Sequence, residues 1–379
     1  MKASGIGVAP TVCFPFVGST VGGSHMSSLL LIEGLLARGV RVEVVTETSG
    51  ALTELLEERA VDYRLLDLDL PRASGITRKI ARMGTAVPAM RSFLRDRKIS
   101  VVHTNDGQIH QRWGLAARSV GSSWVLHHRA PHLTPAMARL ARGSSSLLTV
   151  SHYCRAQLPA PLARRAVVID NPFDPLDPSG LPNTRSAVTD LFDADAGTPV
   201  VGYISNLRQP RKRPATFVDI AGHLTHDFDR RAVFPLVGPI RTALAAQVDQ
   251  RRAKWAIEDR CRLLGSQHPV EPWMAALDVM VIPSVNEPFG RTLVEAAMLG
   301  VPVVATEDGG NGEIIEHGTS GFLVPPDDLS SFARHIDELL GDDELRARMG
   351  ETARARALER FSISSHLDAV MRVYGEVVS

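Results

Sequence analysis

Short apolar runs alternate with segments of helical periodicity along most of the chain. Strands are expected at 11–17, 41–46, 100–104, 124–128, 147–151 and 166–170, and again at 199–205, 232–238, 261–265, 277–284 and 301–306. Helices are expected at 24–38, 75–97, 212–225 and 240–252, and after Gly290. Because apolar strands separated by helices are typical of a parallel sheet covered on both faces, the pattern predicts an α/β protein.

The alternation is interrupted once, over residues 171–197, which are rich in proline, aspartate and glycine. Such a composition is typical of linkers, and 379 residues exceed what one hydrophobic core usually serves. We therefore predict two doubly wound, Rossmann-like domains, at 1–175 and 176–362, and a last helix at 363–379. Ligands of open α/β sheets bind at the carboxyl ends of the strands, so a central cleft between the two sheets is the expected site.

Charge is distributed unevenly, although the formal net charge is +0. Residues 1–170 hold 21 Lys+Arg and 12 Asp+Glu, and the rest of the chain holds 21 and 30. This excess favours an anionic partner for the first half, or only a solvated basic face. The basic stretch 71–100 has apolar residues at helical spacing. It could contact an anionic membrane or receive a phosphorylated or lipid-linked acceptor, but a stripe that faces the core is the plainer explanation.

Several classes of protein are disfavoured by missing signals. Cys13, Cys154 and Cys261 lie far apart without a C-x-x-C pattern, which predicts reduced thiols in a cytoplasmic protein and no zinc site. No signal peptide or membrane-spanning segment is predicted. No metal site of the D-x-D kind that metal-dependent transferases use is predicted. Without a G-x-G-x-x-G fingerprint, a NAD-dependent oxidoreductase is disfavoured too.

Two of the predicted strands are each followed by a notable turn, one that contains two glycines and one that is basic. Gly22 and Gly23 open the first helix, where a bare backbone could approach a phosphate or sugar and Ser24 could cap the helix. A plain tight turn is the alternative. The segment 205–217 contains Arg208 and Lys212 among four cations where a loop enters a helix, and cations there can meet a diphosphate. A solvated basic face explains this run about equally well.

The segment 286–310, NEPFGRTLVEAAMLGVPVVATEDGG, places Glu287 and Glu295 around the start of a helix. A helix N-terminus suits a phosphate, and carboxylates suit hydroxyl groups, so the segment indicates a sugar phosphate. With the flanking IPSV, the strand GVPVVAT and GTSGFLVPP, it resembles the E-x7-E signature of the retaining glycosyltransferases of family 4, which have the GT-B fold. The resemblance extends to the turn at Gly22, to VVHTN at 101–105, to VIDNPFD at 168–174 and to LVGP and LLGS.

The resemblance implies roles for individual residues. The donor would be a nucleoside-diphosphate sugar, most readily a UDP- or GDP-sugar, with no other cofactor. Glu287 would face the transferred sugar and Lys212 would bind phosphate. The remaining donor contacts would be Glu295 on the ribose, backbone near Leu264 and Gly265 on the base, the backbone of Phe289, Gly290 and Arg291, the cation Arg208, and Gly22 and Gly23. The last helix would cross back onto the first domain.

The chain departs from the family pattern at one position. An arginine usually precedes the lysine by five or six residues in a Gly-Arg pair, and Ser205 and Asn206 stand there instead. Arg208 is close enough to supply the charge.

Histidines and neighbouring polar residues in the first half supply the remaining candidates. The tandem His127 and His128 matches the family's cleft histidine, and His128 is preferred as catalytic because it lies nearer the end of its strand. His103, Asn105 and Asp106 lie at the carboxyl end of another predicted strand and are candidates for binding the acceptor, although ordinary loop polarity explains them equally well.

These observations predict a metal-independent, retaining hexosyltransferase that moves a sugar to a hydroxyl acceptor. The acceptor could be a glycan, a lipid-linked or a small molecule, and no nucleic-acid partner is expected. A cytoplasmic location is expected, with possible peripheral contact at the inner face of the membrane. Two alternatives stay open, namely a GT-B epimerase or hydrolase of nucleotide sugars and a non-catalytic sugar-nucleotide binder.

Overall fold

The chain forms two compact units, each built on its own parallel sheet. The computed structural model describes residues 10–66, 68, 75–105, 107 and 109–379, with side chains except those of residues 75–85. Unit 1 comprises Met1–Asp174 and Phe361–Ser379, and unit 2 comprises Pro175–Arg360. The last helix therefore belongs to the first unit.

Unit 1 contains a seven-stranded parallel sheet in the order β3-β2-β1-β4-β5-β6-β7. Its strands are β1 (Val12–Phe16), β2 (Val42–Thr46), β3 (Tyr63–Leu65), β4 (Val101–Thr104), β5 (Ser123–His128), β6 (Ser146–Thr149) and β7 (Ala166–Val168). Its helices are α1 (Gly23–Ala37), α2 (Ala51–Glu58), α3 (Gly75–Asp96), α4 (His110–Val120), α5 (Pro135–Ala141), α6 (His152–Ala156), α7 (Ala160–Ala163) and α15 (Ile363–Val378).

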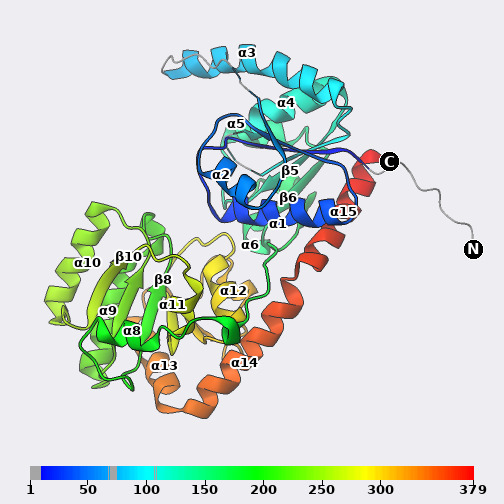
Figure 1. Ribbon diagram of the computed structural model, residues 1–379. Coiled ribbons are helices and arrows are strands. Elements are labelled where there is room, and N and C mark those ends of the chain that lie inside the picture. Colours follow the sequence, from blue (N-terminus) through cyan, green and yellow to red (C-terminus); the bar gives the residue numbers. More distant parts are fainter. Residues whose placement is uncertain (1–9, 67, 69–74, 106, 108) are drawn as a thin grey trace, which may run out of the picture. The chain divides into compact units, whose positions relative to one another are not determined.

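Helices cover both faces of this sheet. The core on one face is formed by α1, α2 and α15, and the core on the other by α3, α4, α5 and residues of α7. Helix α15 packs beside α1 (Figure 1), where Leu367 and Tyr374 are buried. Within α3, Ala86, Met90 and Leu94 are buried, so this part of the basic stretch faces the core. Residues 71–74 and the side chains of residues 75–85 in the same stretch lie outside the description.

Unit 2 contains a six-stranded parallel sheet in the order β10-β9-β8-β11-β12-β13. Its strands are β8 (Val201–Ile204), β9 (Phe234–Val237), β10 (Cys261–Gly265), β11 (Val279–Ile282), β12 (Val303–Thr306) and β13 (Phe322–Val324). Its helices are α8 (Arg185–Asp190), α9 (Pro214–Asp227), α10 (Thr242–Trp255), α11 (Glu271–Ala275), α12 (Arg291–Met298), α13 (Leu329–Gly341) and α14 (Asp343–Arg360), with 3₁₀ turns at Pro178–Gly180, Pro210–Lys212 and Asn311–Glu313.

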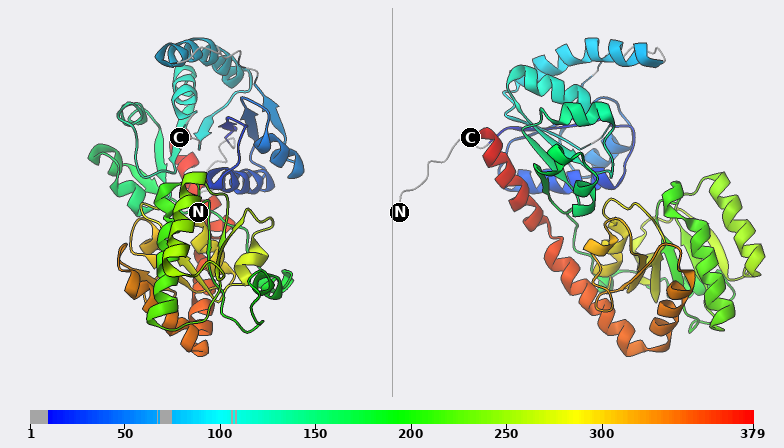
Figure 2. Two further views of the ribbon diagram at one scale, coloured as in Figure 1. Left: turned by 90° about the vertical axis from the view of Figure 1, so that its left-hand side faces the viewer. Right: turned by 180° about the vertical axis from the view of Figure 1, so that it is seen from behind.

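The sheet of unit 2 is also covered on both faces. Helices α9, α10 and α13 pack on one face, and α8, α11 and α12 on the other. The right-hand view of Figure 2 shows α9 and α10 in green on one side of the sheet and α12 in yellow on the other. All four residues of β8, β9, β11 and β12 are buried, as expected for the central strands of a doubly wound sheet. Both units thus confirm the predicted fold class.

The sequence pattern missed several elements. The three-residue strands β3 and β13 were not predicted, and α2 and α4, which lie between predicted strands, were not predicted either. Among the described residues, no helix is long and apolar enough to cross a membrane.

Candidate functional site

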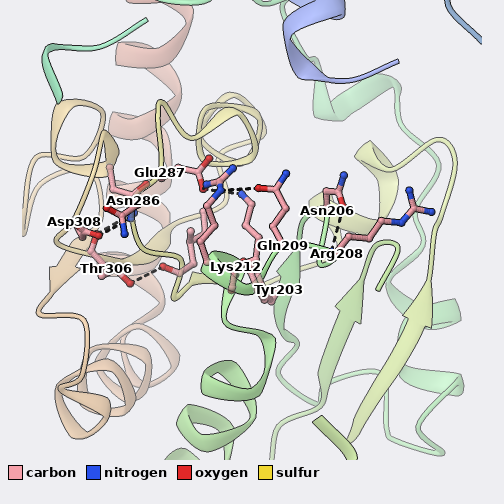
Figure 3. Close-up of polar contacts among 12 residues, drawn as sticks. Tyr203, Asn206, Arg208, Gln209, Lys212, Asn286, Glu287, Thr306 and Asp308 are labelled. Carbon is pink, nitrogen blue, oxygen red and sulfur yellow. Dashed lines mark hydrogen bonds and ion pairs between the residues drawn. The ribbon is translucent and has the colours of Figure 1, made fainter. Parts of the chain in front are cut away.

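Glu287 is the centre of a buried charge cluster in unit 2 (Figure 3). Its side chain is 8% exposed, and its Oε2 accepts hydrogen bonds from Lys212 Nζ at 2.8 Å and from Arg211 Nη1 at 2.6 Å. Burial alone would raise the pKa of this carboxyl group, but the two cations and their hydrogen bonds outweigh burial and lower it. Glu287 is therefore ionised at neutral pH, and the cluster keeps a net positive charge.

The loop that carries Glu287 is held by the Gly-Gly pair after β12. Gly310 N–H donates to the Glu287 carbonyl at 2.8 Å, and Asn286 N–H donates to Asp308 Oδ2 at 2.6 Å. Gly309 has a φ of +65°, and a Cβ built there would lie 2.5 Å from the Glu287 backbone nitrogen. The glycine is thus required both by its conformation and by the close approach of the two backbones. This contact explains why the acidic residue and the distant Gly-Gly pair occur together in the signature.

Lys212 ends a 3₁₀ turn that is fastened to two neighbouring segments. Its backbone carbonyl accepts a hydrogen bond from the buried Tyr203 hydroxyl at 2.8 Å, which ties the turn to β8. The carbonyl of Arg211 accepts from Val285 N–H at 2.9 Å, which ties it to the loop before Glu287. These bonds fix the position of the lysine relative to the carboxylate. The predicted pair of Lys212 and Glu287 is thereby brought together.

Asn206 and Arg208 lie apart from this cluster. Both are exposed, and Asn206 Oδ1 accepts a hydrogen bond from the Arg208 backbone N–H at 3.3 Å, so the amide organises its own loop. Figure 3 shows the Arg208 guanidinium directed away from Glu287 and Lys212. Arg213 binds a different segment, since it donates hydrogen bonds to the Pro326 carbonyl at 2.8 Å and to Asp327 Oδ1 at 2.5 Å.

Helix α12 begins directly after this loop. Gly290 precedes the helix with a φ of +99°, and the side chain of Phe289 is buried. One turn into the helix, Glu295 contacts Arg291 at 3.4 Å and keeps 25% of its side chain exposed. Burial is the main reason that the pKa of Glu295 is raised, and Arg291 opposes it. The partly accessible carboxyl group is suited to accept hydrogen bonds from hydroxyl groups.

The carbonyl groups at the end of β10 already accept hydrogen bonds from within unit 2. Gly265 has a φ of +67° and no atom within 4 Å of a Cβ built there. Its carbonyl accepts from Gly238 N–H at 2.7 Å, and the Leu264 carbonyl accepts from Gln267 Nε2 at 2.8 Å. The contact predicted between this backbone and a nucleotide base stays a prediction.

The glycine turn of unit 1 has a different cap from the one predicted. Helix α1 begins at Gly23, and Gly22 N–H donates to His25 Nδ1 at 3.0 Å. Ser24 therefore lies inside the helix and does not cap it, which corrects the prediction. The cause is that the extended backbone of Gly22 forms the N-cap position itself.

The two tandem histidines of β5 are oriented to opposite faces of the sheet. His127 is fully buried and lies 3.3 Å from His103 Nε2 and 3.2 Å from Arg129 Nη2 through its Nδ1. His128 is 7% exposed, and its buried Nε2 has no hydrogen-bond partner among the described residues. Burial lowers the pKa of His128 to about 4, so it is neutral at physiological pH. Among the described residues, the buried Nε2 of His127 has no hydrogen-bond partner either, and His128, the last residue of β5, is the less buried of the two.

The residues predicted to bind an acceptor are largely enclosed. His103 is 0% exposed and its Nδ1 lies 2.5 Å from the Tyr374 hydroxyl of α15, so its position in the core corrects the prediction that it meets an acceptor. It points inward because alternate residues of β4 face the α1 and α15 layer. Asn105 is 4% exposed and its Oδ1 accepts from Arg129 at 3.0 Å. Asp106 lies outside the described residues.

Sequence reasoning missed two features of these sites. Arg211 was only one member of a basic run, and nothing in the sequence separates it from Arg208 and Arg213. The contact with Glu287 appears only when the turn and the loop fold together. The buried contacts of His103 with His127 and with Tyr374 of α15 were also missed, because these residues are distant in sequence.

Two α/β units with parallel sheets, one of which presents a carboxylate and two cations before a helix N-terminus, match the GT-B architecture. A glycosyltransferase from Rickettsia africae superposes with a TM-score of 0.84 at 18% identity, covering 98% of this chain and 99% of that one. The Anabaena protein HepE, crystallised with UDP and glucose, superposes with a TM-score of 0.80 at 22% identity, covering 97% and 99%. These likenesses establish the fold.

Sequence comparisons identify the family. The model described as Glycosyltransferase Family 4 matches residues 21–175, and the model described as Glycosyl transferases group 1 matches residues 198–342. The N-acetyl-alpha-D-glucosaminyl L-malate synthase of Bacillus anthracis is 32% identical over 176 residues, 46% of this chain and 45% of that protein. The D-inositol 3-phosphate glycosyltransferase of Streptomyces bingchenggensis is 34% identical over 178 residues, 45% and 39%. The chain belongs to glycosyltransferase family 4, and it spans less than half the length of these two curated relatives.

Proposed function

We propose that this protein transfers a sugar from a nucleoside-diphosphate sugar to a hydroxyl acceptor. The observation that carries the proposal is the Glu287 cluster, in which Lys212 meets the carboxylate directly before α12 in a chain of glycosyltransferase family 4. The relative HepE was crystallised with UDP-glucose, which supports a UDP-sugar as the first donor to test.

Different residues of unit 2 would bind different parts of the donor. Lys212 offers an ammonium group to the diphosphate, and the N-terminus of α12 offers its dipole. Glu295, which is partly exposed, accepts hydrogen bonds from the ribose hydroxyls. Glu287 faces the transferred sugar through its Oε1. The contributions of Phe289, Gly290 and Gly265, and of Gly22, Gly23 and His128 in unit 1, remain predictions from the resemblance.

We propose that transfer retains the anomeric configuration without a metal or other cofactor. The bond from the anomeric carbon to the leaving phosphate breaks while the acceptor oxygen bonds to the same face of that carbon. The leaving phosphate takes the acceptor's proton. Glu287 is a poor candidate for a covalent nucleophile because its two cations offset the negative charge of the carboxylate and lower its pKa, which makes it less nucleophilic. The chain's own cations stabilise the charge of the departing diphosphate.

The test is a donor and acceptor screen with purified protein. UDP-glucose, UDP-N-acetylglucosamine and GDP-mannose are incubated with L-malate, with inositol 3-phosphate or without acceptor, and nucleoside diphosphate release is measured. The proposal is supported if EDTA-treated protein forms a product only when acceptor is present, and if the NMR spectrum of that product shows the same anomeric configuration as the donor. Glu295→Ala should abolish transfer, while Glu351→Ala, an exposed position of α14, should not.

The same screen separates the alternatives. Free sugar or an epimer formed without acceptor indicates a hydrolase or an epimerase. Nucleotide-sugar binding without any turnover indicates a non-catalytic binder. A covalent glycosyl adduct on Glu287, trapped and found by mass spectrometry, would contradict the same-face mechanism.

We also propose a cytoplasmic location with peripheral contact at the inner face of the membrane. The buried positions of Cys13 and Cys261 and the basic excess of residues 1–170 support it. Co-sedimentation with anionic and neutral liposomes over a salt series tests the contact, and no binding to anionic liposomes at low salt excludes it.

A further inference from the structure

The loop from Asn206 to Arg213 offers four cationic side chains, and only two of them reach Glu287. Lys212 and Arg211 share its Oε2, Arg213 is bonded to Asp327, and Arg208 is directed away from the cluster (Figure 3). We propose that Arg211 is the second cation that binds the diphosphate of the donor, and that Arg208 has no part in it. This inference rests on the proposed function.

A second cation is needed because Lys212 alone cannot balance the ligand. A departing nucleoside diphosphate carries more than one negative charge, and the ammonium of Lys212 is already shared with Glu287 at 2.8 Å. Asn206 adds no charge, and its side chain is used to organise the loop. Arg211 restores the positive balance of the cluster at the place where the phosphate would lie.

The guanidinium of Arg211 is held in a fixed orientation. Its Nε donates to Gln209 Oε1 at 2.7 Å, and its Nη1 donates to Glu287 at 2.6 Å. The planar group therefore directs its third nitrogen, Nη2, along a set direction, and no described residue accepts a hydrogen bond from Nη2. The side chain remains 29% exposed. A rigid guanidinium with one unused nitrogen is well suited to bind a phosphate oxygen.

The turn that carries Arg211 adds to this preorganisation. The Arg211 carbonyl accepts from Val285 N–H at 2.9 Å, so backbone and side chain both attach to the loop that carries Glu287. Because Arg208 lacks such a link in Figure 3, ordering its long side chain on a ligand would cost more conformational entropy. The two arginines, three residues apart in sequence, are therefore not equivalent.

The test compares nucleotides that differ in phosphate number. Uridine, UMP and UDP, and the guanosine series, are titrated by calorimetry into the wild type and into Arg211→Gln, Arg208→Gln and the control Arg334→Gln, which changes a residue of α13 outside the cluster. Arg211→Gln should weaken nucleoside diphosphate binding at least about tenfold, by the usual strength of a charged hydrogen bond, with little effect on the nucleoside. Arg208→Gln and Arg334→Gln should bind like the wild type.

The outcomes separate this inference from the proposed function. A wild type that binds neither UDP nor GDP would overturn both. If the wild type binds but Arg211→Gln is unchanged, or Arg208→Gln loses as much, only the role of Arg211 is wrong. Equal losses for nucleoside and diphosphate would show that Arg211 merely supports the loop, which also contradicts the proposal. Arg211→Lys should recover part of the diphosphate affinity because it keeps the charge.

Discussion

Substitution of Gly309 by alanine should displace the loop that positions Glu287. A Cβ at this position would lie 2.5 Å from the nitrogen and 2.6 Å from the oxygen of the Glu287 backbone. These contacts are with backbone atoms, so no flexible side chain can move aside. Either Glu287 shifts away from its two cations, or the Gly-Gly turn loses the hydrogen bond from Gly310 N–H at 2.8 Å.

The size of the effect follows from two terms. A left-handed φ costs a residue with a Cβ about 1–2 kcal/mol, and an overpacked contact costs about 1–3 kcal/mol. Gly309→Ala should therefore destabilise unit 2 by about 2–5 kcal/mol. Gly318 is a matched control, because its φ is +76° and a Cβ there meets nothing within 4 Å. Gly318→Ala should cost only the first term, about 1–2 kcal/mol.

Differential scanning calorimetry of the three proteins, together with nucleotide titration, provides the assay. We expect Gly309→Ala to melt below Gly318→Ala and to bind the nucleoside diphosphate more weakly, while Gly318→Ala binds like the wild type. Equal melting temperatures for the two variants, with unchanged nucleotide affinity, would refute the reasoning that the close approach of Gly309 holds Glu287.

Three further predictions concern the cores and the charge cluster. Tyr374→Phe removes the hydroxyl that lies 2.5 Å from His103 Nδ1, and the unpaired buried nitrogen should cost about 1–3 kcal/mol by calorimetry; an unchanged melting temperature contradicts this. In α14, Gly350→Ala places a Cβ 2.1 Å from a backbone oxygen and should destabilise the protein. In α15, a Cβ at Gly375 meets nothing within 4 Å, so Gly375→Ala should stabilise the protein by about 0.5–1 kcal/mol. Urea titrations in which both variants change stability in the same direction would contradict this. The pKa of Glu287 is lowered in the folded protein, so its ionised carboxylate stabilises the fold above the ordinary pKa of a glutamate. This stabilisation is lost as the pH falls through the pKa of the folded state. The free energy of unfolding should therefore fall more on acidification for the wild type than for Glu287→Gln.

The sequence by itself predicted the α/β class, the two sheets and most of their strands. This prediction succeeded because central parallel strands are buried on both faces. The sequences of β8, β11 and β12 are therefore continuous apolar runs, which can be recognised without knowing what they pack against. The signature at 286–310 also pointed to the family, because its helix start, strand and glycine turn are local features that a sequence shows directly. Their order along the chain carries the information.

The roles of individual polar residues required the tertiary structure. Arg208, Arg211 and Arg213 are indistinguishable in a basic run, and only the packing of the 3₁₀ turn against the Glu287 loop selects Arg211. His103 was expected near a strand end open to an acceptor, but Tyr374 of α15, which returns from the end of the chain, covers it. Local sequence fixes which groups are available along a segment. Long-range packing decides where each group points, what it contacts and whether solvent can reach it, because hydrogen bonds and burial depend on residues that are distant in sequence.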